Sequence, residues 1–233
     1  MRDWCLEVWG DFACFTRPEM KVERVSYDII TPSAARGIFE AILWKPTIRW
    51  NITKIEVLNP IRFTSIKRNE VGKTISQPSE KQMSSERSEN NGLYVEVYRQ
   101  QRSSLCLKDV KYRIHGYFDF IPPERRDKDN RKNDNGKEDE SEEKYAAMFE
   151  RRAKKGQCFH RPYLGTREFA CSFRLVDVEH EPSSPIKKDQ DFGFMLYDMD
   201  FSRNKTSPPP LFFRAEMKMG TINTDKREVK VVG

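Results

Sequence analysis

The sequence predicts an α+β fold, in which a ferredoxin-like domain is followed by a small antiparallel β-sheet lobe. Three observations lead to this prediction. The first 121 residues give the order strand, helix, strand, then two more strand segments. Residues 124–144 lack any apolar anchor, and three alternating segments separated by Ser- and Pro-rich loops come after them. We therefore expect the ferredoxin-like domain over 1–123, and a helix plus a β-rich lobe over 145–233.

The first helix is the best-defined element. Thr31 suits an N-cap and Pro32 the first helical position. The next apolar residues have the i, i+3, i+4, i+7 spacing of a core-facing stripe: Ala35, Ile38, Phe39 and Ile42. Pro46 ends the helix, because proline disfavours helical backbone at the preceding residue. A strand over 6–14, broken at Gly10, is expected before this helix.

The segments after the helix alternate between strands and polar linkers. Strands are expected over 52–66, with a bulge or sheet edge at Pro60, and over 93–98 and 102–121. The polar residues 67–92 predict a loop or a long hairpin arm. The charged residues 124–144 predict a disordered loop. A short helix ending near Gly156 comes next, and the last three strands are expected over 167–176, 192–201 and 211–222.

The composition favours a nucleic-acid partner. Lys and Arg number 42 against 36 Asp and Glu, a net charge of +6. Because 124–144 holds 7 basic and 9 acidic residues, a net of −2, the rest of the chain carries +8. A basic body with 12% aromatic residues is typical of nucleic-acid binding.

The sequence gives little support for a bound metal ion, a cofactor or a membrane-spanning segment. The five cysteines include no Cys-x-x-Cys pair and the three histidines are far apart, so we expect no metal site and no cofactor. No apolar run approaches the roughly 18 residues of a membrane span. The N-terminus lacks the pattern of a signal peptide, and the expected location is a reducing cytoplasm.

The stretch from Lys111 to Ile121 is the most informative one. Successive side chains of a strand point to opposite faces. One face would carry residues that suit a core: Tyr112, Ile114, Gly116, Phe118 and Phe120. The other would carry cations, an imidazole and a phenol: Lys111, Arg113, His115, Tyr117 and Asp119. That second face can hold a polyanion and do acid–base chemistry on it, or it is simply a solvated basic face. The strand alone favours neither interpretation.

Several stretches resemble one known family. They are WGDFACFTRPEMKVERVSYDIITPSAARGIFEAILWKPTIRW (9–50), PIRFTSIKRNEV (60–71), RQQRSSLCLKDVKYRIHGYFDF (99–120), LGTREF (164–169) and PLFFRAEM (210–217). In these blocks, which span nearly the whole chain, the sequence resembles the Cas family five subunit of type I-C CRISPR systems. The resemblance implies a ferredoxin-like RAMP domain, of the same type as RNA-recognition (RRM) domains, and a small β-rich lobe.

The resemblance also implies a function. Such proteins are metal-independent endoribonucleases that cut the CRISPR repeat transcript (pre-crRNA) beside its hairpin. They stay bound to the 5′ handle of the guide RNA in the interference complex (Cascade), so its backbone and large subunits are the expected partners. Family members also bind or cut DNA weakly.

Metal-free RNA cleavage needs a base for the 2′-hydroxyl, an acid for the leaving oxygen and cations for the phosphate, and it leaves a 2′,3′-cyclic phosphate. The family commonly combines a Tyr near the end of the first helix with a Lys and a His on the strand matching 111–121. Here Leu43 stands in place of the Tyr, His115 in place of the Lys and Tyr117 in place of the His. We expect His115 as general base or acid, since imidazoles titrate near pH 6.5. Tyr117 is its expected partner, and Lys45 the phosphate-stabilising cation.

Other basic and aromatic residues are expected to bind RNA. They are Arg17, Lys21, Arg24, Trp44, Lys111, Arg113, Lys154, Lys155, His160, Arg161 and Arg167. Rings that stack on bases and cations that follow phosphates suit a single-stranded path, and 154–167 combines both. Trp44 either stacks on a base or plugs the helix end. Because Leu43 cannot transfer a proton, and is expected to pack, the alternative is a non-catalytic subunit that binds the crRNA 5′ handle. A third possibility is an RNA-binding module unrelated to CRISPR.

Overall fold

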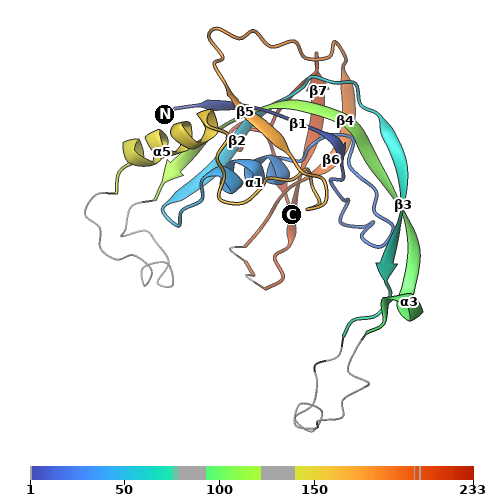
Figure 1. Ribbon diagram of the computed structural model, residues 1–233. Helices are drawn as coiled ribbons and strands as arrows, with labels where there is room; N and C mark the ends of the chain where they lie inside the picture. Colours follow the sequence, from blue (N-terminus) through green and yellow to red (C-terminus); the bar gives the residue numbers. More distant parts are fainter. Residues whose placement is uncertain (1, 76, 78–92, 122–139, 202, 205) are drawn as a thin grey trace.

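The computed structural model describes residues 2–75, 77, 93–121, 140–201, 203–204 and 206–233 (Figure 1). The helices are α1 (Pro32–Ile42), α3 (Val95–Tyr98) and α5 (Glu142–Lys154). The strands up to α5 are β1 (Trp4–Ala13), β2 (Ile48–Val57), β3 (Phe63–Val71) and β4 (Arg99–Phe120). Those after it are β5 (Ser172–Val176), β6 (Gln190–Met199), β7 (Pro210–Lys218), β8 (Thr221–Asn223) and β9 (Val231–Val232). The described part of the chain is therefore mostly strand, with few helices.

All of these strands belong to one antiparallel sheet. Its order is β5-β1-β4-β2-β8-β7-β6, with β3 added on β4 and β9 on β7. The expectation that the C-terminal strands form a small sheet of their own is wrong, because β8 pairs with β2 between Lys54 and Glu56 and extends the first sheet. This pairing satisfies backbone N–H and C=O groups of β2 that would otherwise be unpaired at a sheet edge. The sequences of β2 and β8 contain no pattern from which their pairing could be predicted.

The helices α1 and α5 lie side by side on one face of the sheet (Figure 1). Between them and the sheet lies an aromatic cluster, in which Phe39 of α1 stacks on Phe149 of α5 at 5.6 Å between ring centroids. Trp50 of β2 contacts both rings, at 4.8 and 4.6 Å, and Trp4 and Phe118 complete the cluster. Buried aromatic area of this kind is a large contribution to core stability. The cluster fixes which side of β1, β2 and β4 packs against the helices, so the polar side chains of these strands lie on the opposite side.

The start and end of α1 match the sequence prediction. The Thr31 hydroxyl accepts a hydrogen bond from the Ala34 amide at 3.3 Å, and Pro32 is the first helical residue. Leu43 is the C-cap residue, with extended backbone. The predicted stripe Ala35, Ile38, Phe39 and Ile42 is fully buried.

Other elements differ from the prediction. Gly10 does not break β1; its missing side chain makes room for Leu164, whose Cδ1 atom would lie 2.6 Å from a Cβ. The strand expected over 52–66 is two strands, β2 and β3, with Pro60 between them. Residues 95–98 are the short helix α3, because the β3–β4 ladder starts at the Val71–Arg99 pair and none of the described strands pairs with them.

The β3–β4 hairpin extends from the body of the molecule (Figure 1), and its strand β3 includes residues 67–71 of the segment expected as a loop or hairpin arm over 67–92. The rest of that arm, at 76 and 78–92, lies outside the described residues, as does most of the charged loop expected over 124–144.

Candidate active site and nucleic-acid interface

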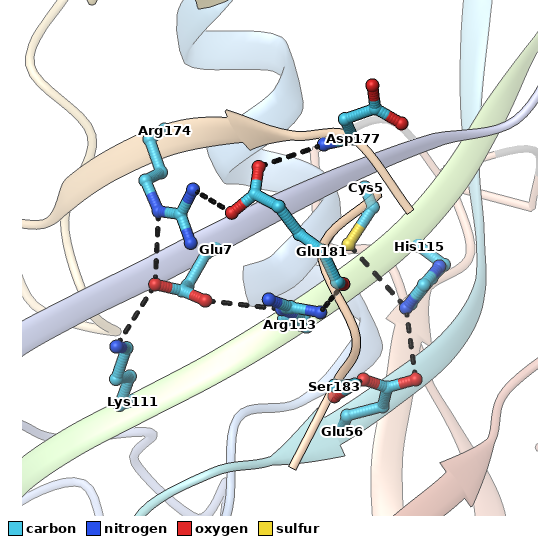
Figure 2. A network of polar contacts seen from close by, with 10 residues as sticks. All are labelled: Cys5, Glu7, Glu56, Lys111, Arg113, His115, Arg174, Asp177, Glu181 and Ser183. Atoms are coloured by element: carbon cyan, nitrogen blue, oxygen red, sulfur yellow. Dashed lines mark hydrogen bonds and ion pairs between the residues drawn. The ribbon is translucent and has the colours of Figure 1, made fainter. Parts of the chain in front are cut away.

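The face of the sheet away from the helices carries a network of charged side chains (Figure 2). Its centre is Glu7 of β1, which lies 3.0 Å from Lys111 Nζ, 3.2 Å from Arg113 Nε and 3.1 Å from Arg174 Nε. Burial by itself would raise the pKa of the Glu7 carboxyl, but the hydrogen bonds from Arg174, Lys111 and Arg113 lower that pKa to about 2. One carboxylate thus contacts three cations.

His115 lies beside this centre, on the same face. Its Nε2 atom is 3.3 Å from Oε1 of Glu56 and 3.6 Å from Sγ of Cys5 (Figure 2). Glu56 also pairs with Lys54 at 2.7 Å and accepts a hydrogen bond from Ser183. Burial would raise the pKa of Glu56, yet the hydrogen bonds from His115, Lys54 and Ser183 hold it well below its ordinary range.

The Cys5–His115–Glu56 group is not a nucleophilic triad. In a triad, the base contacts the nucleophile through one ring nitrogen and the orienting acid through the other. Here Cys5 and Glu56 both contact Nε2 of His115. Burial, with a further contribution from the Glu56 charge, raises the pKa of the Cys5 thiol to about 12, so the thiol stays protonated.

A segment after β5, residues 177–188, crosses this face as a strap. Arg174 of β5 pairs with Glu181 at 2.5 Å, and Arg113 of β4 donates to the Glu181 carbonyl at 2.9 Å. Farther along, the Ile186 amide donates to the Val57 carbonyl of β2 at 2.9 Å. The strap leaves the Arg113 side chain 7% exposed. The sequence-based expectation of an open sheet face is therefore wrong here, because backbone and side chains of the strap cover it.

Tyr117 lies farther along the same face of β4. Its ring is covered by the Arg227 guanidinium, 5.3 Å from the ring centroid, and the residue is 7% exposed. Burial raises the pKa of the phenol; the nearby Asp119 adds to this and Arg227 opposes it. The phenol is thus protonated at neutral pH and suited to donating a hydrogen bond.

A second surface lies at the C-terminal end of α1, and we call it the helix-end surface. The α1 carbonyls there are satisfied from α5 and the loop after it: Arg152 Nη1 donates to the Ile42 carbonyl and the Phe159 amide to the Ala41 carbonyl, both at 2.8 Å. On this fixed base, Trp44 is 57% and Phe159 81% exposed. Exposed cations and an imidazole surround them: Lys45, Lys154, Lys155, His160 and Arg161. Leu43, between Ile42 and Trp44, is fully buried.

Comparison with known proteins identifies the family. The family model for CRISPR-associated proteins of the Cas5d type, described as CRISPR-associated protein (Cas_Cas5), matches residues 4–225. The chain belongs to the Cas5d family. It is 48% identical, over 224 residues, to a protein of Mannheimia succiniciproducens named CRISPR pre-crRNA endoribonuclease Cas5d, covering 94% of this chain and 92% of that protein. A Thermus thermophilus protein of the same name is 38% identical over 233 residues, covering 93% and 89%.

Solved structures agree on the fold of this Cas5d chain. A crystal structure of a CRISPR-associated protein superposes with a TM-score of 0.66 at 24% identity, covering 100% of this chain and 97% of that one. The Streptococcus mutans protein SMU1763c, whose structure was described as functionally uncharacterized, gives a TM-score of 0.64 at 23% identity with the same coverage.

The Cas5d chain brings some of the sequence-predicted site residues together and separates others. His115 and Tyr117 share the strap-covered face, whereas Lys45 follows α1, which packs on the other face. Four expected RNA ligands are already paired within the chain: Arg17 with Asp28, Arg24 with Glu70 and Glu168, and Lys111 and Arg113 with Glu7. Five exposed ones make no ion pair within the described ranges: Lys21, Lys154, Lys155, Arg161 and Arg167.

Sequence reasoning missed the acids that hold the network. Glu7 and Glu56 are each a lone acid among apolar neighbours of a strand, and both are buried. That pattern is a usable signal, because a buried carboxylate requires a cation or donors close by. Within the described ranges, no cluster of three or more His, Cys, Asp or Glu residues could hold a metal ion. None of the helices described is long and apolar enough to cross a membrane.

Proposed function

We propose that this chain is an endoribonuclease that processes CRISPR repeat transcripts into guide RNAs and remains bound to their 5′ handle in the type I-C interference complex. One observation carries the proposal: both curated relatives, 48% and 38% identical over about nine-tenths of each chain, are named CRISPR pre-crRNA endoribonuclease. The reaction is metal-independent and leaves a 2′,3′-cyclic phosphate. The backbone and large subunits of the complex are the protein partners, the chain also contacts DNA weakly, and the protein works in the cytoplasm.

The proposed chemistry assigns proton transfer to His115 and Tyr117. Glu56 holds Nε2 of His115, which leaves Nδ1, without a partner among the described residues, as the nitrogen that transfers a proton. Tyr117 is protonated at neutral pH and donates that proton to the leaving 5′-oxygen, while Nδ1 of His115 accepts the proton of the 2′-hydroxyl. Lys45 is exposed on the helix-end surface, on the other side of the sheet from His115, so its positive charge acts on the RNA along that surface and not on the reacting phosphate.

The helix-end surface is the proposed path of single-stranded RNA. Trp44 and Phe159 present exposed rings for base stacking, while Lys154, Lys155, His160, Arg161 and Arg167 contact the phosphates. Lys21 extends the contact with the phosphates. Four other cations would join it if RNA phosphates replaced the acidic side chains with which they now pair: Arg17, Arg24, Lys111 and Arg113. Since Arg113 is nearly buried, its exchange is the most costly of these.

A ferredoxin-like domain of the RAMP type underlies this site. When β3 and α3 are set aside as an insertion between β2 and β4, the element order is β1-α1-β2-β4-α5-β5. This order and the sheet order β5-β1-β4-β2, with α1 and α5 on one face, support the assignment. In this arrangement the ferredoxin-like domain includes α5 and β5, and it extends past the expected limit at residue 123.

The test is incubation of the purified chain with its cognate repeat RNA in EDTA. We expect a single cut beside the hairpin, with a 2′,3′-cyclic phosphate on the upstream product. His115→Ala should lower the single-turnover rate at least 100-fold, the scale of a lost general acid or base. His180→Ala is the matched control, because His180 is largely exposed on the strap and pairs only with Asp177 among the described residues. Full cutting by His115→Ala would remove that residue from the mechanism.

A second function is favoured by Leu43. It is fully buried where the family commonly has a tyrosine, so the end of α1 offers no phenol to the RNA. In this alternative the chain binds the 5′ handle without cutting, and another nuclease matures the transcript. Tight binding of the repeat RNA by wild type without cleavage would establish it. Equal affinity for the repeat and a scrambled hairpin would point instead to an RNA-binding module unrelated to CRISPR.

A further inference from the structure

A cavity of about 340 Å³ lies between the start of α1, the first half of β2, and β6 and β7. The residues that carry its chemistry are Arg36, Arg49, Asn51, Tyr197, Phe201 and Lys226. We propose that this cavity binds one flipped-out nucleotide of single-stranded RNA, with its phosphate at Arg49 and Lys226 and its base against Phe201. The proposal rests on the proposed RNA-processing function and adds a subsite to it.

The size of the cavity suits a small ligand. Pockets for small molecules and cofactors have volumes of about 300–1,000 Å³. At about 340 Å³ this one lies near the lower limit. A single nucleotide fits that limit, whereas a stacked pair of nucleotides does not.

The charges around the cavity favour an anion. Its partly buried cation Arg36 pairs with Glu40 at 2.6 Å and with Asp198 at 2.7 Å. Another acid of the lining, Asp200, pairs with Arg203 at 3.2 Å. Arg49 and Lys226 are exposed, and neither makes an ion pair with any residue that the structure describes. Three acids, Glu40, Asp198 and Asp200, are set against four cations, Arg36, Arg203, Arg49 and Lys226, so a net charge of +1 remains, which suits a phosphate.

The polar and aromatic groups favour a base over a bare phosphate. The Phe201 ring is 55% exposed, and an exposed ring is a platform on which a base of any identity can stack. The Asn51 amide nitrogen donates to Asp119 at 2.8 Å, which leaves its carbonyl oxygen as an acceptor for a base amino group. The Tyr197 hydroxyl donates to the Thr224 carbonyl at 3.1 Å, so its oxygen is oriented as a second acceptor.

The cavity adjoins the proposed cleavage face. Asn51 of β2 lies directly opposite Tyr117 of β4 in the strand register. Arg227, the residue after Lys226, covers the Tyr117 ring. A nucleotide fixed in the cavity would therefore hold the neighbouring RNA backbone next to Tyr117, and would set the register in which the strand meets His115.

The test uses the cognate repeat RNA with 2-aminopurine placed, one position at a time, through the single-stranded nucleotides beside the hairpin. With wild type we expect one position whose fluorescence changes sharply on binding. Phe201→Ala should abolish the change at that position and weaken binding roughly 5- to 150-fold, the scale of one lost stacking contact. The double variant Arg49→Ala/Lys226→Ala should lower the slope of log affinity against log salt by about 1, the equivalent of one phosphate.

Two variants serve as matched controls. Phe194→Ala removes a ring of similar exposure, 62%, from β6 outside the cavity, and Lys218→Ala removes an exposed lysine from β7. Both should bind like wild type. If wild type does not bind the repeat RNA, the proposed function fails and this subsite with it. If wild type binds and cuts while the cavity variants match the controls, only the subsite is refuted.

Discussion

Arg113 and Glu7 form an ion pair in the interior of the molecule, on the sheet face that the sequence presents as an RNA platform. They stand directly opposite each other on β4 and β1, with Arg113 Nε 3.2 Å from Glu7 Oε2 and each side chain only 7% exposed. A buried guanidinium is tolerable only when its donors are satisfied, and the Glu181 carbonyl accepts from the same side chain at 2.9 Å. The pair therefore joins β1, β4 and the strap.

Loss of the Glu7 charge should destabilise the whole chain. Glu7→Gln keeps the shape of the side chain but leaves Arg113 with an uncompensated charge in a buried position. Breaking a buried pair in this way costs about 3 kcal/mol or more, and urea unfolding followed by circular dichroism measures it. Arg174→Ala is the control, since Arg174 is 42% exposed and its removal should cost less than about 1 kcal/mol. Equal losses in the two variants would contradict this account of Glu7.

The same carboxyl should make stability depend on acid pH. The pKa of Glu7 is lowered in the folded chain from its ordinary 4.5 to about 2. As pH falls below 4.5 the unfolded chain takes up a proton at this site and the folded chain does not, so stability is lost progressively until the folded carboxyl also protonates near pH 2. Urea midpoints measured between pH 6 and pH 3 should fall more steeply for wild type than for Glu7→Gln. Some slope should remain in the variant, because the pKa of Glu56 is lowered as well. Parallel curves would show that Glu7 is not the linked group.

The start of α1 and the core face of β4 could be predicted from the sequence, but the strap that covers the other face of β4 could not. The start of α1 follows from Thr31 and Pro32, and the strict alternation of β4 gives the correct core face, with Tyr112, Ile114 and Phe118 buried. The other face of β4 is covered by the strap at 177–188, which has no periodicity and little apolar content. Its position depends on hydrogen bonds to Arg113 and Glu56 across the sheet. Sequence patterns report local preference, whereas such contacts are set only when distant segments meet.

Placing at position 43 the tyrosine that the family resemblance implies should not create a catalytic group. Leu43 is fully buried, so the ring of Leu43→Tyr would have to displace core neighbours or leave the core and disturb the end of α1. We expect a loss of about 1–3 kcal/mol in unfolding free energy, the usual cost of overpacking, and no gain in the rate of repeat cleavage. Val22→Tyr, at a position that is 61% exposed, is the matched control and should leave stability unchanged. A faster cut by Leu43→Tyr at normal stability would mean that position 43 can reach the RNA.

The exposed rings of the helix-end surface should contribute to affinity for RNA and not to stability. Trp44 and Phe159 are 57% and 81% exposed, so truncating either to Ala removes little buried area and should leave the unfolding midpoint unchanged. Each lost stacking contact should weaken binding of the single-stranded part of the repeat by about 1–3 kcal/mol, which fluorescence anisotropy at fixed salt can measure. The alternative role for Trp44, a plug at the end of α1, predicts the reverse: a lower unfolding midpoint for Trp44→Ala with RNA affinity unchanged. Phe159→Ala separates the two roles further, since the hydrogen bond from Phe159 to α1 comes from its backbone amide and is retained in the variant.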